Sequence, residues 1–476
     1  MKFNKAIPLA LTLSPLAAAV MKTALTPKKV SEYSPKHEPE REKEYAEKLS
    51  KMVRYETVSR PNTDMREKFL GFHVILQKLF PLVHEKLEKT ETDGNLLYYW
   101  KGRSSERPVL LMSHQDVVPA GGGWSHGPFS GDIADGRVWG RGTADTKCTV
   151  MAFLQAAEEL LKEGFEPEQD IYLASSCTEE WAGDGAPKIV NELKRRGVKL
   201  FLLCDEGGAI LSEPVGGIKG CYAMIGILEK GKADIKFTAR SAGGHASAPG
   251  RNTPVARLAA FVNEFEKHDP FRRKFIPEVS SMFGKLSEYA PFGLRLVMGN
   301  LRLFAPLMKR VMPLISSQAN AMLKTTIAFT MQSGSDAYNV IPQEATLGAN
   351  VRFIPHQGEK ESLAIIKRLA DKHGLETEII HSNDCAPSVD IEGEAYKRVT
   401  KVIEQTFPGL AHSPYVMTGA TDSQFYHGVC DSCIRFGPVV FGPDQMKGMH
   451  GIDENIDVAC LPGAVDFYKN LIKASE

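Results

Sequence analysis

The sequence has no excess of charge of either sign. Its 58 lysines and arginines balance 58 aspartates and glutamates, and no long basic stretch occurs after the first fifty residues. Nucleic-acid binding depends on neutralising phosphates with clustered basic side chains. The balanced charge therefore argues against a nucleic-acid partner.

The sequence also lacks a cysteine framework of the kind that holds small secreted proteins together. Its 8 cysteines are scattered. Several stand inside apolar runs: Cys148, Cys177, Cys204 and Cys221. This placement is typical of free, buried thiols in a reducing compartment. Cys430 and Cys433 have metal-knuckle spacing, but no second pair lies nearby, so we expect no zinc or redox motif there.

The N-terminal apolar run is shorter than the roughly 20 residues that a comfortable membrane helix needs. Residues 1–23 begin with MKFNK, continue through apolar residues and two prolines, and carry three alanines at 17–19. This pattern resembles a signal peptide or a weak membrane anchor. Either would make the protein secreted or membrane-anchored, whereas the free cysteines favour the cytoplasm. The localisation and any membrane contact therefore stay open.

With 476 residues the chain is long for one domain, so we expect two lobes. Residues 24–45 are polar and rich in proline, lysine and glutamate, which suits a linker. Between 46 and 219, strand-like segments such as VLLMSHQD and IYLASSCTEE alternate with helical ones such as TVMAFLQAAEELLKEGF. This alternation predicts an α/β catalytic domain with a mostly parallel sheet between helices.

Residues 220–384 have a different pattern. AMIGILEKGKADIKFTARS alternates apolar and polar residues, as an antiparallel strand with one exposed face does. We expect an inserted α+β lid or dimerisation domain here, after which residues 385–476 return to the first lobe. The insert carries an extra helical, apolar segment from 271 to 323. That segment either packs within the insert, caps a hydrophobic acyl or side-chain pocket, or touches a membrane.

Polar clusters follow several predicted strands, and the carboxyl edge of such a sheet is where ligands bind. The most unusual cluster is Glu179 next to Glu180, because adjacent carboxylates repel each other wherever water is excluded. The other candidates are His114 and Asp116 in SHQD, Asp145 in WGRGTADTK, Asp205 in LLCDEGG and His450 in GMHGIDEN. Taken singly, each fits a surface histidine or a capping carboxylate. Together they suit one or two zinc ions.

Seven separated motifs carry a resemblance to a known family. In chain order they are SHQDVVPA, WGRGTADTK, TEEWAGDGA, DEGG, SAGGHASAPG, NVIP and TGATDSQFY. They resemble the zinc metallopeptidase family of aminoacylase, carboxypeptidase S, glutamate carboxypeptidase and succinyl-diaminopimelate desuccinylase. NAMLKTTIAFTMQSG is most similar to the branch of carboxypeptidase S and the secreted N-acyl amino acid hydrolases. The resemblance implies a zinc-exopeptidase fold and a hydrolase that acts on C–N bonds.

The resemblance also implies two zinc ions. The residues that match the family's ligands are His114 and Asp205 for one ion, Glu180 and His450 for the other, and Asp145 for both. Cobalt or manganese could use the same ligands. One glutamate of the adjacent pair would then be neutralised by a metal, which would leave its neighbour free to handle protons.

Further roles follow from the same resemblance. Glu179 would be the general base on a metal-bridging water, and Asp116 would orient His114. His245 in SAGGHASAPG would stabilise the oxyanion from the lid domain of a partner subunit, which implies a homodimer. These roles come from matching the motifs, since nothing in the spacing of the residues establishes them.

Three more residues match the family's substrate contacts. Asn339 in NVIP and Arg352 in ANVRF resemble anchors for a substrate carboxylate, and an arginine fork suits such a group. Thr421 in TGATDSQFY would line the pocket. The implied substrates are dipeptides or N-acyl amino acids with a free carboxylate.

Two other functions stay open from the sequence. An aminopeptidase or dipeptidase would need an acidic group for a free amine, which Asp422 or Glu206 could supply. An inactive metal-binding scaffold would be favoured if Glu179 or a ligand were missing, and none is missing. The sequence does not identify the preferred side chain or acyl group.

Overall fold

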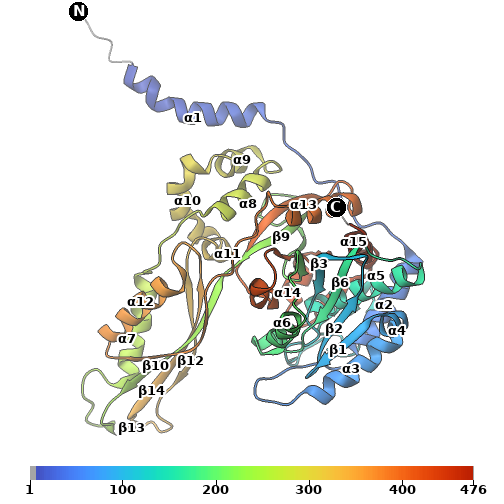
Figure 1. Cartoon of the computed structure of the whole chain (residues 1–476). Helices are drawn as coiled ribbons and strands as arrows, with labels where there is room; N and C mark the ends of the chain where they lie inside the picture. The colour runs from blue at the N-terminus through green and yellow to red at the C-terminus, as the bar shows by residue number, and fades with distance from the viewer. Residues whose placement is uncertain (1–6, 475–476) are drawn as a thin grey trace, which may run out of the picture.

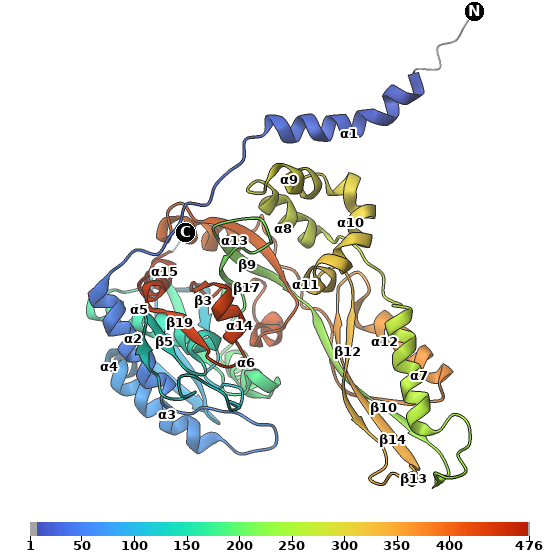
Figure 2. The ribbon, with the colours of Figure 1, turned by 180° about the vertical axis from the view of Figure 1, so that it is seen from behind.

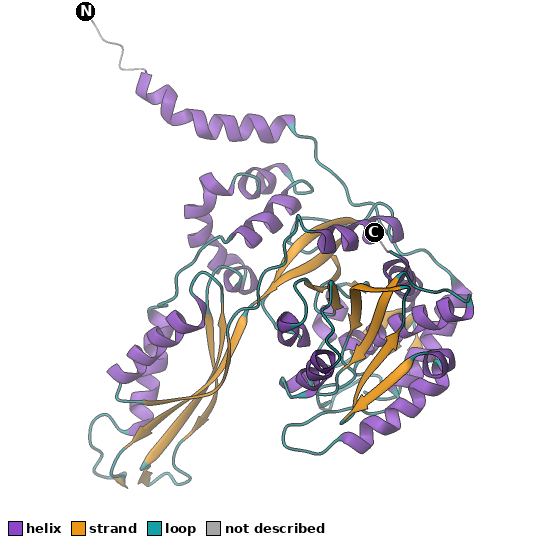
Figure 3. Cartoon of the chain, in the orientation of Figure 1, coloured by secondary structure: helices purple, strands orange, loops and turns teal. Residues whose placement is uncertain are grey.

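The computed structural model describes residues 7–474, with side chains from residue 15 onward. The first six residues of the predicted signal segment lie outside the described part. The chain forms two lobes that are joined at one end and diverge from there (Figure 1). Each lobe has its own sheet, and helices cover both (Figure 3).

The larger lobe is built on a ten-stranded sheet whose central strands run parallel. The strands are, in spatial order, β1 (Glu88–Thr92), β2 (Asn95–Trp100), β6 (Gln169–Ser175), β3 (Ser104–Met112), β7 (Leu202–Asp205), β17 (Cys433–Arg435), β9 (Cys221–Glu229), β8 (Ala209–Ser212) and β18 (Val440–Phe441), with β16 (Ala411–Met417) parallel to β9. A small sheet beside it contains β4 (Ile133–Ala134), β5 (Arg137–Trp139) and β19 (Asn455–Asp457).

Alternating side chains of the central strands bury both faces of this sheet. In β3, Val109 and Leu111 join one hydrophobic cluster, whereas Leu110 and Met112 join another on the opposite face. The first face is covered mainly by α2 (Pro39–Val53), α3 (Arg66–Leu79), α4 (Pro81–Lys86), α5 (Cys148–Lys162), α13 (Glu394–Thr406) and α15 (Leu461–Lys473). The second is covered by α6 (Gly185–Arg195) and the 3-10 helix Asp422–Gly428. The predicted α/β class is thus confirmed.

The smaller lobe is a four-stranded antiparallel sheet in the order β12 (Thr326–Ser333), β14 (Glu344–Phe353), β10 (Gly231–Arg240) and β15 (Glu376–Asn383). Strand β10 alternates buried and half-buried residues, and its buried side packs under α7 (Pro254–Lys267) and α12 (Gly358–Lys372). A short ladder of β11 (Gly244–His245) and β13 (Val340–Ile341) forms the tip. Figures 1 and 2 show this tip pointing away from the joined end.

Lys230 separates the two sheets. The strand before it, β9, belongs to the large sheet, and the strand after it, β10, belongs to the small one. The Lys230 ammonium is buried and donates hydrogen bonds of 2.9 Å to the carbonyl oxygens of Ala321 and Lys324. The alternating segment that we interpret as one strand therefore forms two, and the Lys230 side chain is hydrogen-bonded inside the junction between them.

The helical segment of the insert contains α8 (Pro277–Ser287), α9 (Phe292–Met298), α10 (Leu301–Ile315) and α11 (Ser317–Ala321). Buried residues of α8 join the hydrophobic cluster of the larger lobe, whereas α10 contributes only Met312. The N-terminal helix α1 (Ile7–Leu25) lies beside α9 and α10 at the same end of the molecule (Figures 1 and 2). No helix within residues 7–474 is long and apolar enough to cross a membrane.

Candidate active site

The candidate active site lies where the central strands of the large sheet end. Strands β6, β3 and β7 are parallel neighbours, so their carboxyl ends meet at one edge. His114 follows β3, Glu179 and Glu180 follow β6, and Asp205 is the last residue of β7. The topology thus gathers residues that are far apart in the chain.

Three side chains come close enough to share one cation. A ring nitrogen of His114 and carboxylate oxygens of Asp145 and Glu180 all lie within 4.8 Å of one another. The Nε2 atom of His114 lies 3.0 Å from Oδ1 of Asp145. The Nε2 atom of His450 lies 2.9 Å from Oδ2 of Asp145 and 3.1 Å from Oε2 of Glu180. The two oxygens of Asp145 therefore face two different imidazoles.

Asp205 is buried at the same sheet edge but does not join that close group. Its Oδ1 accepts a hydrogen bond of 2.9 Å from the backbone N–H of Glu206, and its Oδ2 accepts one of 3.0 Å from that of Ser423. Two backbone donors thus fix the carboxylate at the end of β7.

Asp116 holds the turn that carries the two glutamates. Its carboxylate accepts hydrogen bonds from the backbone N–H groups of Glu179 (3.2 Å) and Glu180 (3.3 Å). The Nδ1 atom of His114 lies 2.9 Å from the Asp116 carbonyl oxygen and 3.4 Å from its Oδ1. Because Nδ1–H donates to that carbonyl, Nε2 is the ring nitrogen that faces Asp145. The backbone of Asp116 therefore orients His114 more closely than its carboxylate does.

Glu454 is a residue that sequence reasoning missed. It is fully buried, and its Oε1 accepts hydrogen bonds from the backbone N–H groups of Gly142 (3.0 Å), Ala144 (2.9 Å) and Asp145 (3.0 Å). Its Oε2 pairs with Arg141 at 2.6 Å. Glu454 follows His450 by four positions, so it ties the loop of one predicted ligand to the turn of another. The GIDEN segment was the only sequence signal that could have indicated it.

The 3-10 helix after Thr421 belongs to a second buried network. The Thr421 hydroxyl donates to Oε1 of Glu229 at 2.6 Å, and Glu229 pairs with Arg435 at 3.1 Å. Thr421 is therefore buried against Glu229 in this chain. Asp422 is buried as well and accepts a hydrogen bond from the hydroxyl of Ser176. The network connects the end of β9 to the helix that also positions Asp205.

The insert residues lie in two separate places. Arg352 is near the junction, and its Nε donates to Oδ1 of Asn350 at 3.0 Å. Burial lowers the pKa of Arg352, and the charges of Asp234 and Glu179 oppose that shift. His245 is exposed at the tip, with Nδ1 at 2.8 Å from Oγ of Ser247.

Asn339 lies at that same tip, where its carbonyl oxygen accepts a hydrogen bond of 2.9 Å from the backbone N–H of Ala246. From Glu344 to Arg352 the strand β14 alone extends about 26 Å. Asn339 and Arg352 of one chain therefore cannot hold the same carboxylate in this arrangement. His245 and Asn339, by contrast, lie together at the tip.

The electrostatics of the strand-end site reflect crowded carboxylates. Burial raises the pKa of Glu179 well above its usual range, His114 opposes this shift, and Glu206 reinforces it. Burial also raises the pKa of Glu180, which the hydrogen bond from His450 partly offsets, and Asp145 reinforces the rise. These carboxyl groups favour the neutral form as long as nothing more positive lies between them.

The two imidazoles, by contrast, favour their charged form. Hydrogen bonds to Asp145 and Glu180 raise the pKa of His450 to about 10. Burial would lower the pKa of His114, but hydrogen bonds to Asp116 and Asp145 raise it well above its usual range. Burial would likewise raise the pKa of Asp145, and the hydrogen bonds from His114 and His450 lower it.

The donor set fits a divalent cation. Imidazole nitrogens and carboxylate oxygens are the ligands that zinc prefers outside thiolate sites. Within residues 7–474, the ion pairs of Asp145, Glu179 and Glu180 are made with histidines, with no lysine or arginine among them. A dication would offset the clustered negative charge and let both imidazoles bind in their neutral form.

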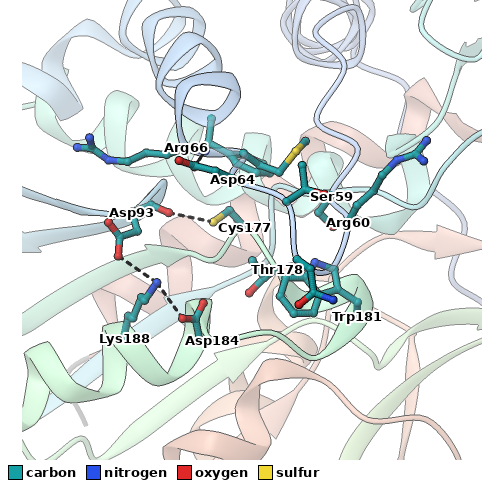
Figure 4. Close-up of a pocket in the computed structure, with 14 residues that line it drawn as sticks. Ser59, Arg60, Asp64, Arg66, Asp93, Cys177, Thr178, Trp181, Asp184 and Lys188 are labelled. Atoms are coloured by element: carbon teal, nitrogen blue, oxygen red, sulfur yellow. Dashed lines mark hydrogen bonds and ion pairs between the residues drawn. The ribbon is translucent and has the colours of Figure 1, made fainter.

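A cavity of about 660 Å³ borders this site. Thr178 and Trp181, on either side of the glutamate pair, form part of its wall, as does Ser59, whose hydroxyl donates to Asp116 at 2.6 Å (Figure 4). Lys188 on the far wall is neutralised by Asp93 and Asp184. The turn thus has open space behind it that is large enough for a small organic group.

Comparison with known proteins gives consistent results. The profile of peptidase family M20/M25/M40 matches residues 110–474. A probable carboxypeptidase S-like 2 of Dictyostelium discoideum is 33% identical over 446 residues, which cover 91% of this chain and 85% of that protein. The N-fatty-acyl-amino acid synthase/hydrolase PM20D1 of Xenopus tropicalis is 35% identical over 443 residues, which cover 91% and 86%. The crystal structure of the M20 family metallo-carboxypeptidase Sso-CP2 of Sulfolobus solfataricus superposes with a TM-score of 0.68 at 17% identity, over 90% of this chain and 98% of that one.

Proposed function

We propose that this chain, which belongs to peptidase family M20/M25/M40, cleaves the amide bond of small substrates that carry a free carboxylate. Membership of the family makes it a hydrolase of the metallopeptidase type. The substrate class rests on two kinds of relative, which are named carboxypeptidases and N-fatty-acyl-amino acid hydrolases. Dipeptides and N-acyl amino acids both have an amide bond next to a free carboxylate.

The observation that carries the proposal is the position of Asp145 between two imidazoles. With His114 at one oxygen and His450 at the other, Asp145 has the arrangement that a carboxylate shared by two ions requires. In the proposed centre, Asp205 completes the first metal site and Glu180 the second. Zinc is the preferred occupant, with cobalt or manganese as alternatives. When bound, such ions acidify a water molecule and polarise an amide carbonyl.

Glu179 is the proposed general base. Its Oε2 lies 3.9 Å from Nε2 of His114, next to the close group of ligands. A cation bound beside it would keep its carboxylate ionised, so the side chain could take a proton from water and release it again to the leaving amine. Asp116 fixes the backbone of this residue and of Glu180 in one turn, which keeps the base and the ligand in a constant relation.

Arg352 is the proposed anchor for the substrate carboxylate within the same chain. It lies at the junction end of β14 and experiences the charge of Glu179. His245 and Asn339 lie at the far tip, so they would act on the site of a second copy, with the lid domain as the dimer contact. His245 would then stabilise the developing oxyanion, and Asn339 would share the carboxylate with Arg352. Thr421 would contribute through the loop next to Asp205.

The aminopeptidase alternative has less support from the geometry. Asp422 is buried and engaged by Ser176, and burial raises its pKa to about 7. Burial also raises the pKa of Glu206 well above its usual range, and Asp205 reinforces the shift. Neutral or engaged carboxyl groups are poor partners for a free ammonium group.

The proposal is tested by amine release from dipeptides and N-acyl amino acids with zinc added. Each substrate is paired with its C-terminal amide, and Arg352→Lys is compared with wild type. Activity on free acids, much weaker activity on amides, and a reduced difference in the variant would support both the reaction and the anchor. Equal activity on acids and amides would overturn the anchor. Absence of amine release by zinc-loaded protein would overturn the proposed reaction.

A further inference from the structure

Helix α10 exposes an apolar stripe that no described part of the chain covers. Leu303, Leu307, Val311 and Leu314 recur at intervals of four, four and three, which places them on one face of the helix. Their exposed fractions are 41%, 56%, 37% and 86%, and Ile315 at the end is 76% exposed. Met312 is the only buried residue among the 15 of α10. The most apolar face of α10 is therefore exposed and does not anchor the helix to the rest of the protein.

The segment that contains this stripe carries charge of one sign. Residues 289–335 contain no aspartate or glutamate. The basic residues of α9 and α10 are Arg295, Arg302, Lys309 and Arg310. In the described part of the chain none of these four forms an ion pair, in contrast to Lys324, which pairs with Asp269. An exposed apolar face flanked by unpaired cations is typical of a helix that lies in a membrane interface.

A groove beside α10 also combines apolar residues with basic ones. It has a volume of about 1050 Å³ and lies between α1 and the helices α8 to α10. Its lining includes the apolar residues Phe275, Met298 and Leu301, whereas Lys22 and Lys274 supply further cations. None of the described residues that line it is an aspartate or a glutamate. The groove therefore offers both apolar contacts and positive charge.

Helix α1 adds to the apolar surface at this end of the molecule. Ala19 and Thr23 are buried, whereas Met21 and Leu25 are 62% and 77% exposed. In both ribbon views α1 lies with α9 and α10, far from the tip of the lid (Figures 1 and 2). Two helices with exposed apolar residues thus occur together.

We propose that this end of the molecule, with the stripe of α10 at its centre, docks on an anionic lipid surface. The stripe enters the boundary between head groups and acyl chains, and the cations of α10 and the groove contact the head groups. A second copy of the chain is a poorer occupant, since two faces of the same positive charge repel when they meet. The inference is independent of the proposed reaction, because no residue of the strand-end site takes part.

Flotation of the full chain with lipid vesicles tests this inference. Wild type floats with vesicles of phosphatidylcholine that contain about 30% phosphatidylserine, and stays at the bottom with phosphatidylcholine alone. Leu307→Glu with Leu314→Glu lowers the vesicle-bound fraction by about tenfold or more, because two charges enter the apolar boundary. Lys309→Ala with Arg310→Ala lowers binding to the anionic vesicles and makes the remainder less sensitive to salt.

Matched controls come from exposed residues elsewhere. Ile379→Glu with Ile380→Glu alters two apolar residues of β15 that are 50% and 60% exposed, and leaves flotation unchanged. All variants are checked for amine release and for thermal unfolding. Equal flotation of the α10 and β15 variants overturns the proposal, as does an absence of binding by wild type. A change in oligomeric state of the α10 variant without lipid binding assigns the stripe to a second copy instead.

Discussion

Glu454 accepts a hydrogen bond of 3.0 Å from the backbone N–H of Asp145, although 309 positions separate the two residues. The same oxygen also binds the N–H groups of Gly142 and Ala144. A single buried carboxylate thus shapes the turn that places Asp145 between two imidazoles. The contact makes the C-terminal loop a structural part of the proposed metal centre.

Glu454→Gln is expected to weaken zinc binding and kcat/KM by about 10- to 100-fold, since residues behind metal ligands commonly have effects of that size. Loss of its charge leaves Arg141 buried without a counter-ion, which lowers the free energy of unfolding by about 3 kcal/mol. Metal content, amine release and thermal unfolding measure the effects. Asp444→Asn, an exposed acid of the same segment, is the control. Wild-type zinc content in Glu454→Gln would contradict this role.

Arg352→Lys is expected to raise KM for free-acid substrates by about 10- to 100-fold, because a lysine cannot reproduce the bidentate contact with a carboxylate. The kcat/KM for the corresponding amides changes little. Steady-state kinetics on paired acids and amides measure the effect. An equal loss for both members of each pair would show that Arg352 acts on the fold or on catalysis.

Mixing two inactive variants tests whether the lid tip acts on a second copy. Glu179→Ala lacks the base of its own site, and His245→Ala lacks the residue that it would supply to its partner. In a mixed dimer, one site receives Glu179 and His245 intact. Co-refolded equal amounts are then expected to recover about a quarter of wild-type activity, because about half of the dimers are mixed and each has one active site. No recovery in verified mixed dimers would place His245 outside the reaction.

The buried Lys230 side chain predicts how the stability of the protein changes with pH. Burial lowers its pKa to about 7 in the folded chain, whereas an unfolded lysine titrates near 10.4. Between these values the unfolded state binds more protons, so wild type gains stability as pH rises from about 7 to about 10. The gain is absent in Lys230→Met. Chemical denaturation at several pH values should show wild type rising relative to the variant by a few kcal/mol, and a constant difference would contradict this account.

Much of the strand-end site could be predicted from the sequence. His114, Glu180 and Asp205 follow apolar runs, and parallel strands bring their ends together. The contribution of Glu454 could not be predicted, because its partners are about three hundred positions away and its own segment has an ordinary loop composition. The same holds for Glu229, which is buried at the junction of the two sheets and whose partners come from the C-terminal part of the chain.

Other features could not be predicted, because the same sequence pattern fits more than one structure. The segment AMIGILEKGKADIKFTARS predicts a single strand, and only the structure shows that Lys230 divides it between two sheets. The apolar residues of α10 have the spacing of a core helix, yet its stripe is exposed. Asn339 and Arg352 resemble one carboxylate clamp, and the length of β14 separates them.

The central claim is that a metal centre built around Asp145 works with Glu179 as its base. The most direct measurement combines zinc content and amine release in the same samples of wild type and Glu179→Gln. The account predicts equal zinc content, close to two ions per chain, and a loss of kcat in the variant of about 100- to 10,000-fold. Substantial turnover by zinc-loaded Glu179→Gln would contradict the role of the base, and wild type that is active without bound metal would contradict the centre itself.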